Sequence, residues 1–393
     1  MPPPPRTPGP RPSPSSPRPC AAERAAESGR ASYTGAPVDR REPVMSVEAR
    51  IILIVVLIAV FLFYRKDLRQ KIVAWFKNLV NPSPYTEEMR RRDTASQEVI
   101  VADRPLKKKT RVPPPKPIGG GLEQRLAVIG ELELWYVAGG DQGRPSVLLL
   151  HGLTGDKEQW IPVATALVAE GFRVVAPDLP GCGQNAKDPQ ESYDVTSQVK
   201  RLRALIQRLS LAPLHAVGVD VGGTIAAALA YALKEKARSL TLIEPFGVRV
   251  PYETELDKLL AQGRNPFLVA TPAAYDNLLS FVCSTPSADP RQGERARRTA
   301  EDRAVNLKIW QDMREGERAN LLDLLLPELN HKTLYLQGAS SNVVHPKTAD
   351  LVPTLMRNAT SVVLEGCGHW PMVERPEETA EHLAAFLRSV PAE

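Results

Sequence analysis

From residue 122 to the end of the chain, short apolar runs alternate with longer stretches in which apolar residues recur at helical spacing. The short runs predict buried strands and the longer stretches predict helices. Strands that alternate with helices predict a mostly parallel sheet with helices on both faces, which is an α/β fold. The predicted strands are 125–129, 132–137, 146–150, 172–177, 214–217, 239–243, 333–336 and 361–364, and the predicted helices are 160–170, 195–209, 224–234 and 377–387.

Residues 246–326 interrupt this alternation with mixed helical segments. We expect these residues to form a helical lid inserted into one domain that spans residues 122–393. Leu, Phe and Val are frequent in the lid, which favours a small apolar or lipid-like substrate.

The chain ahead of this domain begins with a tail and continues with a hydrophobic segment. Residues 1–44 are dominated by Pro, Arg, Ser and Ala, a composition that predicts disorder, and a translation start at Met45 would remove them. Every residue in 51–64 is apolar or aromatic, and with its flanking residues this run is long enough to cross a bilayer. Residues 45–80 are therefore predicted to form a single-pass membrane anchor followed by a juxtamembrane helix.

Charge and cysteine content narrow the possible partners. Basic residues are denser after the hydrophobic segment than before it, which predicts that the domain lies in the cytoplasm. A linker that is first charged and then rich in Pro and Gly follows over residues 81–121. The net charge of +5 is modest and its basic clusters precede the domain, which favours membrane lipids over nucleic acid as partners. Four widely spaced cysteines indicate neither a disulfide framework nor a metal site, and no motif calls for a cofactor.

The motif GVDVGG over residues 218–223 joins a predicted strand to a predicted helix. This is the form of a nucleophile elbow, in which small residues flank an exposed central residue at a sharp turn. The central residue here is Asp220. The letters DVGGT also occur in the phosphate loop of sugar kinases, but that loop joins two strands of a hairpin near the start of its domain. The helix-forming run that follows Gly223 argues against the kinase alternative.

Other polar residues follow predicted strands at equivalent places. His151 ends the strand 146–150, Glu244 ends the strand 239–243, and His369 comes shortly after the last strand in a Gly-His-Trp context. Ligand sites in open α/β sheets lie beyond the carboxyl ends of the strands, so we expect these residues to share one site with Asp220.

The chain resembles the α/β-hydrolase fold, and more closely its membrane-anchored monoacylglycerol lipases and esterases. The resemblance covers residues 122–393 and is carried by the elbow and by the motifs PSVLLLHG (145–152), DLPG (178–181), QVKR (198–201), LEGCGH (364–369) and ERP (374–376). It implies that His369 is the catalytic histidine and that the backbone N–H groups of Leu153 and Val221 form an oxyanion hole. His151 is interpreted as structural.

Two departures from the lipase pattern prevent a direct transfer of the serine mechanism. The resemblance calls for Ser where the chain has Asp220, and for an Asp in the loop after the strand 333–336, which instead reads GASSN. Glu244 lies where haloalkane dehalogenases of the same fold can place their acid. An Asp220–His369–Glu244 set is chemically complete: the carboxylate forms an ester with the substrate, and the histidine activates water to hydrolyse that ester.

The sequence leaves several alternatives for the type of bond that is cleaved. Epoxide hydrolases protonate the opening oxygen with acids of the lid, and Tyr252 and Tyr275 are the candidates here. One alternative is a catalytically impaired pseudo-hydrolase that binds lipid or acts as a scaffold. Another is an esterase that uses a different nucleophile, Ser341 or Cys182.

Overall fold

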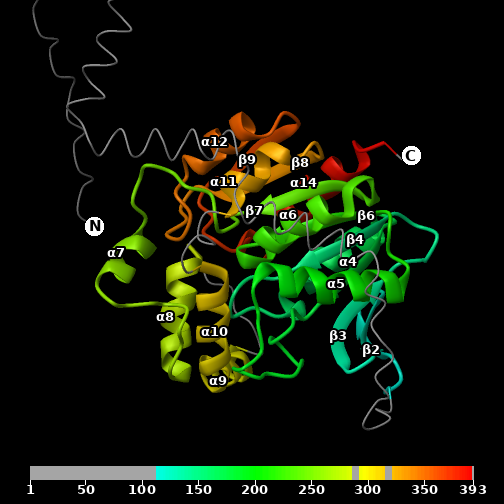
Figure 1. Ribbon diagram of the computed structural model, residues 1–393, viewed down its shortest axis with the longest axis horizontal. Helices are drawn as coiled ribbons and strands as arrows, with labels where there is room; N and C mark the ends of the chain where they lie inside the picture. Colours follow the sequence, from blue (N-terminus) through cyan, green and yellow to red (C-terminus); the bar gives the residue numbers. More distant parts are fainter. Residues whose placement is uncertain (1–111, 286–291, 315–320, 392–393) are drawn as a thin grey trace, which may run out of the picture. The chain divides into compact units, whose positions relative to one another are not determined.

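The computed structural model describes residues 112–285, 292–314 and 321–391 (Figure 1). The predicted tail, the membrane anchor and most of the linker lie outside these residues. Within the described ranges, no helix has both the length and the apolar character needed to cross a membrane.

The described residues form a nine-stranded sheet in the order β1-β2-β3-β5-β4-β6-β7-β8-β9 (Figure 1). Strands β1 to β3 form an antiparallel edge, and β3 pairs antiparallel with β5. All pairs from β5 through β4 and β6 to β9 are parallel, so the prediction of a mostly parallel sheet is confirmed. The strands are β1 (Lys116–Gly119), β2 (Leu122–Ile129), β3 (Leu132–Gly139), β4 (Ser146–Leu150), β5 (Arg173–Pro177), β6 (Leu214–Val219), β7 (Ala237–Ile243), β8 (Lys332–Gly338) and β9 (Ala359–Leu364).

Helices follow most of the parallel strands. Helix α4 packs against α14, and α5 packs against α6. In the inserted segment between β7 and β8, the described residues form helices α7 to α11 (Figure 1). The helices are α4 (Ile161–Ala169), α5 (Val195–Leu209), α6 (Val221–Leu233), α7 (Glu255–Ala261), α8 (Pro272–Val282), α9 (Gln292–Glu301), α10 (Arg303–Arg314), α11 (Leu321–Leu325), α12 (Thr348–Leu355), α13 (Pro371–Glu374) and α14 (Pro376–Arg388), and short 3₁₀ turns are η1 (Lys157–Trp160), η2 (Lys234–Lys236) and η4 (Leu326–Glu328).

The central strands are apolar because both of their faces are covered. Every residue of β4 and β6 is buried, which is why these strands are mostly apolar in the sequence. Amphipathic α5 buries one stripe, and its first turn is capped by the side chain of Asp194, which accepts a hydrogen bond from the backbone N–H of Ser197. The rigid centre of the sheet thereby fixes the strand ends where the site lies.

The structure differs from the sequence prediction at two elements. Strand β1 lies within residues that were assigned to the linker, so the folded domain begins before residue 122. Its Pro and Gly content conceals an edge strand, a place where Pro is tolerated. Helix α12 was not predicted, and it contains Pro353, a residue that normally ends a helix.

Candidate active site

Asp220 occupies the sharp turn between β6 and α6. Its backbone has φ 55° and ψ −126°, a conformation that residues with a side chain rarely adopt. The turn is tight: a Cβ atom at Gly218 would collide with the backbone of Gly222, and one at Gly222 would collide with the carbonyl oxygen of His151. The small residues of the elbow therefore permit the close approach that holds Asp220 over the end of the sheet.

Glu244 and His369 meet Asp220 at this end of the sheet. One carboxylate oxygen of Glu244, Oε1, accepts a hydrogen bond of 2.7 Å from the backbone N–H of Gly338 at the end of β8. The other, Oε2, lies 2.8 Å from Nδ1 of His369. The backbone N–H of His369 donates to the carbonyl of Val282 over 2.6 Å, and Asp220, Glu244 and His369 are all fully buried. The imidazole is thus held from two sides.

The two oxygens of the Asp220 carboxylate have different surroundings. Oδ2 accepts a hydrogen bond of 3.0 Å from the backbone N–H of Leu153 and lies 3.9 Å from Nε2 of His369. Oδ1 is buried and has no hydrogen-bond partner among the described residues. Val221 is the first residue of α6, where backbone N–H groups have no acceptor inside the helix. One oxygen is therefore held by a backbone amide, and the other is left open.

The charge of Asp220 acts on His369. Burial alone lowers the pKa of His369, but the carboxylates of Asp220, at 3.9 Å, and of Glu244, at 2.8 Å, outweigh it and raise this pKa from 6.5 to about 9. The two carboxylates therefore favour the protonated form of the resting histidine. Removal of the negative charge on Asp220 would lower the pKa of His369 again.

Aromatic rings pack around the imidazole of His369. The ring of Phe246 stacks on the imidazole at a centroid distance of 6.1 Å, and the ring of Phe267 meets it edge-on at 6.4 Å. Trp310, on α10, stacks on Phe267 at 6.0 Å. The guanidinium of Arg314 lies over the rings of Phe246 and Trp310, at 4.0 and 4.6 Å from their centroids. The walls next to the candidate catalytic residues are therefore apolar, apart from one cation.

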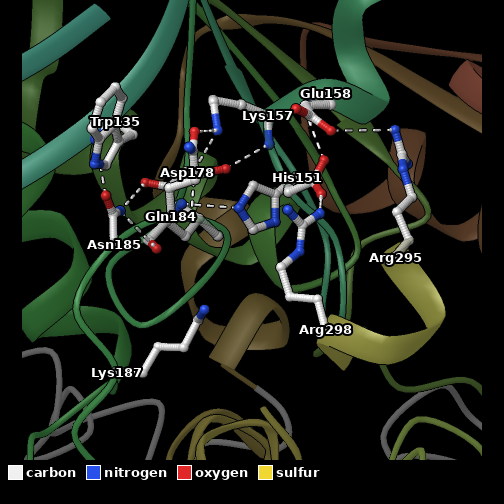
Figure 2. Close-up of polar contacts among 12 residues, drawn as sticks. Trp135, His151, Lys157, Glu158, Asp178, Gln184, Asn185, Lys187, Arg295 and Arg298 are labelled. Carbon is white, nitrogen blue, oxygen red and sulfur yellow. Dashed lines mark hydrogen bonds and ion pairs between the residues drawn. The ribbon is translucent and has the colours of Figure 1, made fainter. Parts of the chain in front are cut away.

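A buried ionic network supports the loop that carries Leu153 (Figure 2). Nζ of Lys157 lies 2.7 Å from Oδ2 of Asp178, and both side chains are fully buried. Asp156 pairs with Arg298 of α9. The imidazole of His151 accepts a hydrogen bond of 2.9 Å from the backbone N–H of Leu179 and lies 2.8 Å from the carbonyl of Gly152 through its other nitrogen.

His151 therefore uses both of its ring nitrogens in structural contacts, in agreement with its interpretation from the sequence. Burial lowers its pKa, which favours the neutral form that these contacts need.

The two tyrosines proposed as lid acids lie in different places. Tyr252 is 51% exposed and stacks on His345 at 4.7 Å. Tyr275 is buried on α8 and lines a cavity together with Arg298 and Thr299. Neither belongs to the aromatic walls around His369, and their role as acids stays a prediction.

The two alternative nucleophiles are also placed by the structure. Cys182 is buried, and burial raises the pKa of its thiol far above the usual value, which disfavours the reactive thiolate. The hydroxyl of Ser341 accepts hydrogen bonds from the backbone N–H groups of Val343 and Val344 in the loop after β8. Over the described ranges, no group of three His, Cys, Asp or Glu side chains could hold a metal ion.

The sequence reasoning missed the four side chains Phe246, Phe267, Trp310 and Arg314. Trp310 and Arg314 are four residues apart, so their common face on one helix was readable from the sequence. The contact of that face with His369 was not.

Comparison with known proteins agrees with this architecture. The family described as alpha/beta hydrolase fold matches residues 145–376. The chain is 27% identical to monoacylglycerol lipase abhd6-B of Xenopus laevis over 287 residues, which cover 69% of this chain and 83% of that protein. It is 28% identical to lipase 1 of Psychrobacter immobilis over 260 residues, which cover 64% of this chain and 79% of the lipase.

A crystal structure of a membrane phospholipase A, described as a bacterial virulence factor, is also similar. It superposes with a TM-score of 0.66 at 30% identity, over 88% of this chain and 99% of the phospholipase. The protein belongs to the α/β-hydrolase fold family, and it is a hydrolase of the lipase and esterase type.

Proposed function

We propose that this hydrolase cleaves an apolar or lipid-like substrate through a covalent ester on Asp220. The different surroundings of the two carboxylate oxygens of Asp220 support this mechanism most strongly. Oδ2 is held by the backbone N–H of Leu153, and Oδ1 is buried without a hydrogen-bond partner within the described ranges, as expected for an oxygen that attacks an electrophilic carbon.

In the first step, Oδ1 of Asp220 donates an electron pair to the electrophilic carbon of the substrate, and the leaving group departs with the electrons of the broken bond. A carboxylate needs no base for this step. The product is an ester of Asp220, which has lost its negative charge.

In the second step, His369 acts as the base. The loss of charge on Asp220 removes the influence of one of the two carboxylates that raise the pKa of His369, so the imidazolium passes its proton to an oxygen leaving group or, when a halide leaves, to solvent water. The neutral imidazole then takes a proton from a water that attacks Cγ of the ester. The Leu153 and Val221 amides stabilise the oxyanion that forms on Oδ2, and Glu244 stabilises the imidazolium.

Three observations support an apolar substrate. Phe246, Phe267 and Trp310 surround the imidazole of His369. Lipases and a phospholipase are among the similar proteins. The apolar run at 51–64 suits a single-pass anchor that holds the domain at the cytoplasmic face of a membrane, with α7 to α11 as its lid.

The test is intact-mass spectrometry of His369→Gln after incubation with a panel of epoxides, haloalkanes and long-chain esters. Without the water-activating base, the ester should accumulate, and peptide mapping should place it on Asp220. The double variant His369→Gln/Asp220→Asn is the matched control and should gain no mass. Absence of any adduct, together with absence of turnover by the wild type, would favour the pseudo-hydrolase that binds lipid without cleaving it.

A further inference from the structure

Arg314 is a partly buried cation that the mechanism above does not use. It is the last residue of α10, and Nη1 of its guanidinium is buried without a hydrogen-bond partner among the described residues. Burial is also the main reason that its pKa is lowered from the usual value. A buried, incompletely paired charge destabilises a folded protein unless another group compensates for it, so this position calls for an explanation.

The contacts of Arg314 place its guanidinium beside the candidate active site. Its guanidinium lies 4.0 Å from the centroid of Phe246, and the same ring also stacks on the imidazole of His369. The charge of Asp220 is the largest of the influences that raise the pKa of Arg314. No ion pair between Arg314 and Asp220 forms among the described residues. The cation is thus near the nucleophile without contacting it.

The first chemical step moves a negative charge away from Asp220. When Oδ1 forms its bond to carbon, the carboxylate becomes neutral, and the same unit of charge appears on the leaving group, on the far side of the carbon. For an in-line displacement, that group lies several ångströms beyond Oδ1. A cation that is close to Asp220 without contacting it, and that has a free N–H, suits that position.

We propose that Arg314 binds the leaving group of the reaction as a small anion, either a halide or the oxygen anion of an alkoxide or carboxylate. This inference rests on the proposed ester mechanism. A halide leaves as the free ion and needs no proton. An alkoxide takes up the proton that His369 releases when Asp220 loses its charge. Arg314 itself keeps its protons and acts through charge and hydrogen bonding.

The neighbouring Trp310 provides a measurement that does not depend on turnover. Its ring lies 4.6 Å from the guanidinium, so a bromide ion bound by Arg314 should quench its fluorescence. In the full chain, we expect a saturable quenching component on titration with bromide, over the linear collisional background of the other tryptophans. Asp220→Asn mimics the uncharged ester state and should bind bromide more tightly than the wild type.

Variants of Arg314 and Trp310 test whether the saturable quenching arises from bromide bound at Arg314. Arg314→Met and Trp310→Phe should each lose the saturable component, and Arg314→Lys should retain it with weaker binding. Acetate, which does not quench, should displace bromide if oxygen anions use the same site, and failure to displace it would restrict the site to halides. A saturable component that persists in Arg314→Met, or its absence from Asp220→Asn, would overturn the proposal.

A kinetic measurement separates this inference from the proposed function. In the His369→Gln background, addition of Arg314→Met should slow formation of the Asp220 adduct about 10²- to 10³-fold, the usual effect of removing one donor to a developing anion. The loss should be largest for the poorest leaving group. Adduct formation at an unchanged rate would refute the role of Arg314 and leave the ester mechanism intact. Absence of any adduct would refute the mechanism, while the bromide titration would still report on the anion site.

Discussion

Buried charges are paired in the loop that carries Leu153, whereas buried atoms of Asp220 and Arg314 have no hydrogen-bond partner among the described residues. On the loop side, Asp156 and Lys157 each contact an opposite charge, and the Lys157–Asp178 pair excludes solvent completely. In contrast, Oδ1 of Asp220 and Nη1 of Arg314, at the end of α10, are buried with no hydrogen-bond partner in the described part of the chain. The loop must hold the Leu153 amide still, and paired charges do this. Oδ1 of Asp220 and Nη1 of Arg314 are the atoms that a reacting molecule would contact.

The largest effect on catalysis should come from substitution of Glu244, whose carboxylate contacts the imidazole of His369. Glu244→Gln keeps the shape of the side chain but removes the charge that orients and stabilises the imidazolium. We expect kcat to fall on the order of 10³- to 10⁴-fold. The measurement is steady-state hydrolysis of the substrate identified by trapping. Glu378→Gln, on the surface, is the matched control, and an equal rate in both variants would contradict the role of Glu244.

Lys157→Met tests how much the Lys157–Asp178 ion pair contributes to the stability of the folded protein. The substitution leaves Asp178 charged and buried without its partner, so the free energy of unfolding should fall by about 3–5 kcal/mol. Urea denaturation followed by circular dichroism measures this. The double variant Lys157→Met/Asp178→Asn should recover much of the loss because no unpaired charge remains. If the double variant is less stable than the single one, the ion pair is not what the loop requires.

The raised pKa of His369 predicts a pH dependence of stability. The folded pKa of about 9 exceeds the ordinary value of 6.5, so the stabilisation is fully present below pH 6.5 and is lost as the pH rises through 9. Relative to His369→Gln, the wild type should lose up to about 3 kcal/mol over this window. Urea titrations at a series of pH values measure the difference. Parallel curves for the two proteins would show that Asp220 and Glu244 do not hold a proton on His369.

The smallest effect is expected where the inserted segment meets the loop. Arg298→Gln removes the ion pair with Asp156 at a partly exposed position, so we expect a loss of about 0.5–1 kcal/mol in stability. The melting temperature should fall by a few degrees, and the fall should shrink at high salt. Arg297→Gln, on the exposed face of the same helix, should have no effect. A salt-independent loss would point to packing instead of charge.

The same comparison shows what the sequence can and cannot predict. Strands β4 and β6 are readable because a strand buried on both faces is mostly apolar. The meeting of Asp220, Glu244 and His369 follows from the rule that parallel strands deliver their ends to one edge. No alternation rule governs how α10 packs on that edge, so Arg314 and Trp310 could not be assigned to the site. Their positions depend on tertiary contacts of the inserted segment.

The central claim is that Asp220 supplies an oxygen atom to the product, and a single-turnover experiment in heavy-oxygen water tests it most directly. With enzyme in excess over substrate, water attacks Cγ of the ester. The released product should therefore carry ordinary oxygen from the enzyme, and the peptide that contains Asp220 should gain one heavy oxygen. Heavy oxygen in the first product molecules, with none in Asp220, would show that water attacks the substrate directly and would contradict the account.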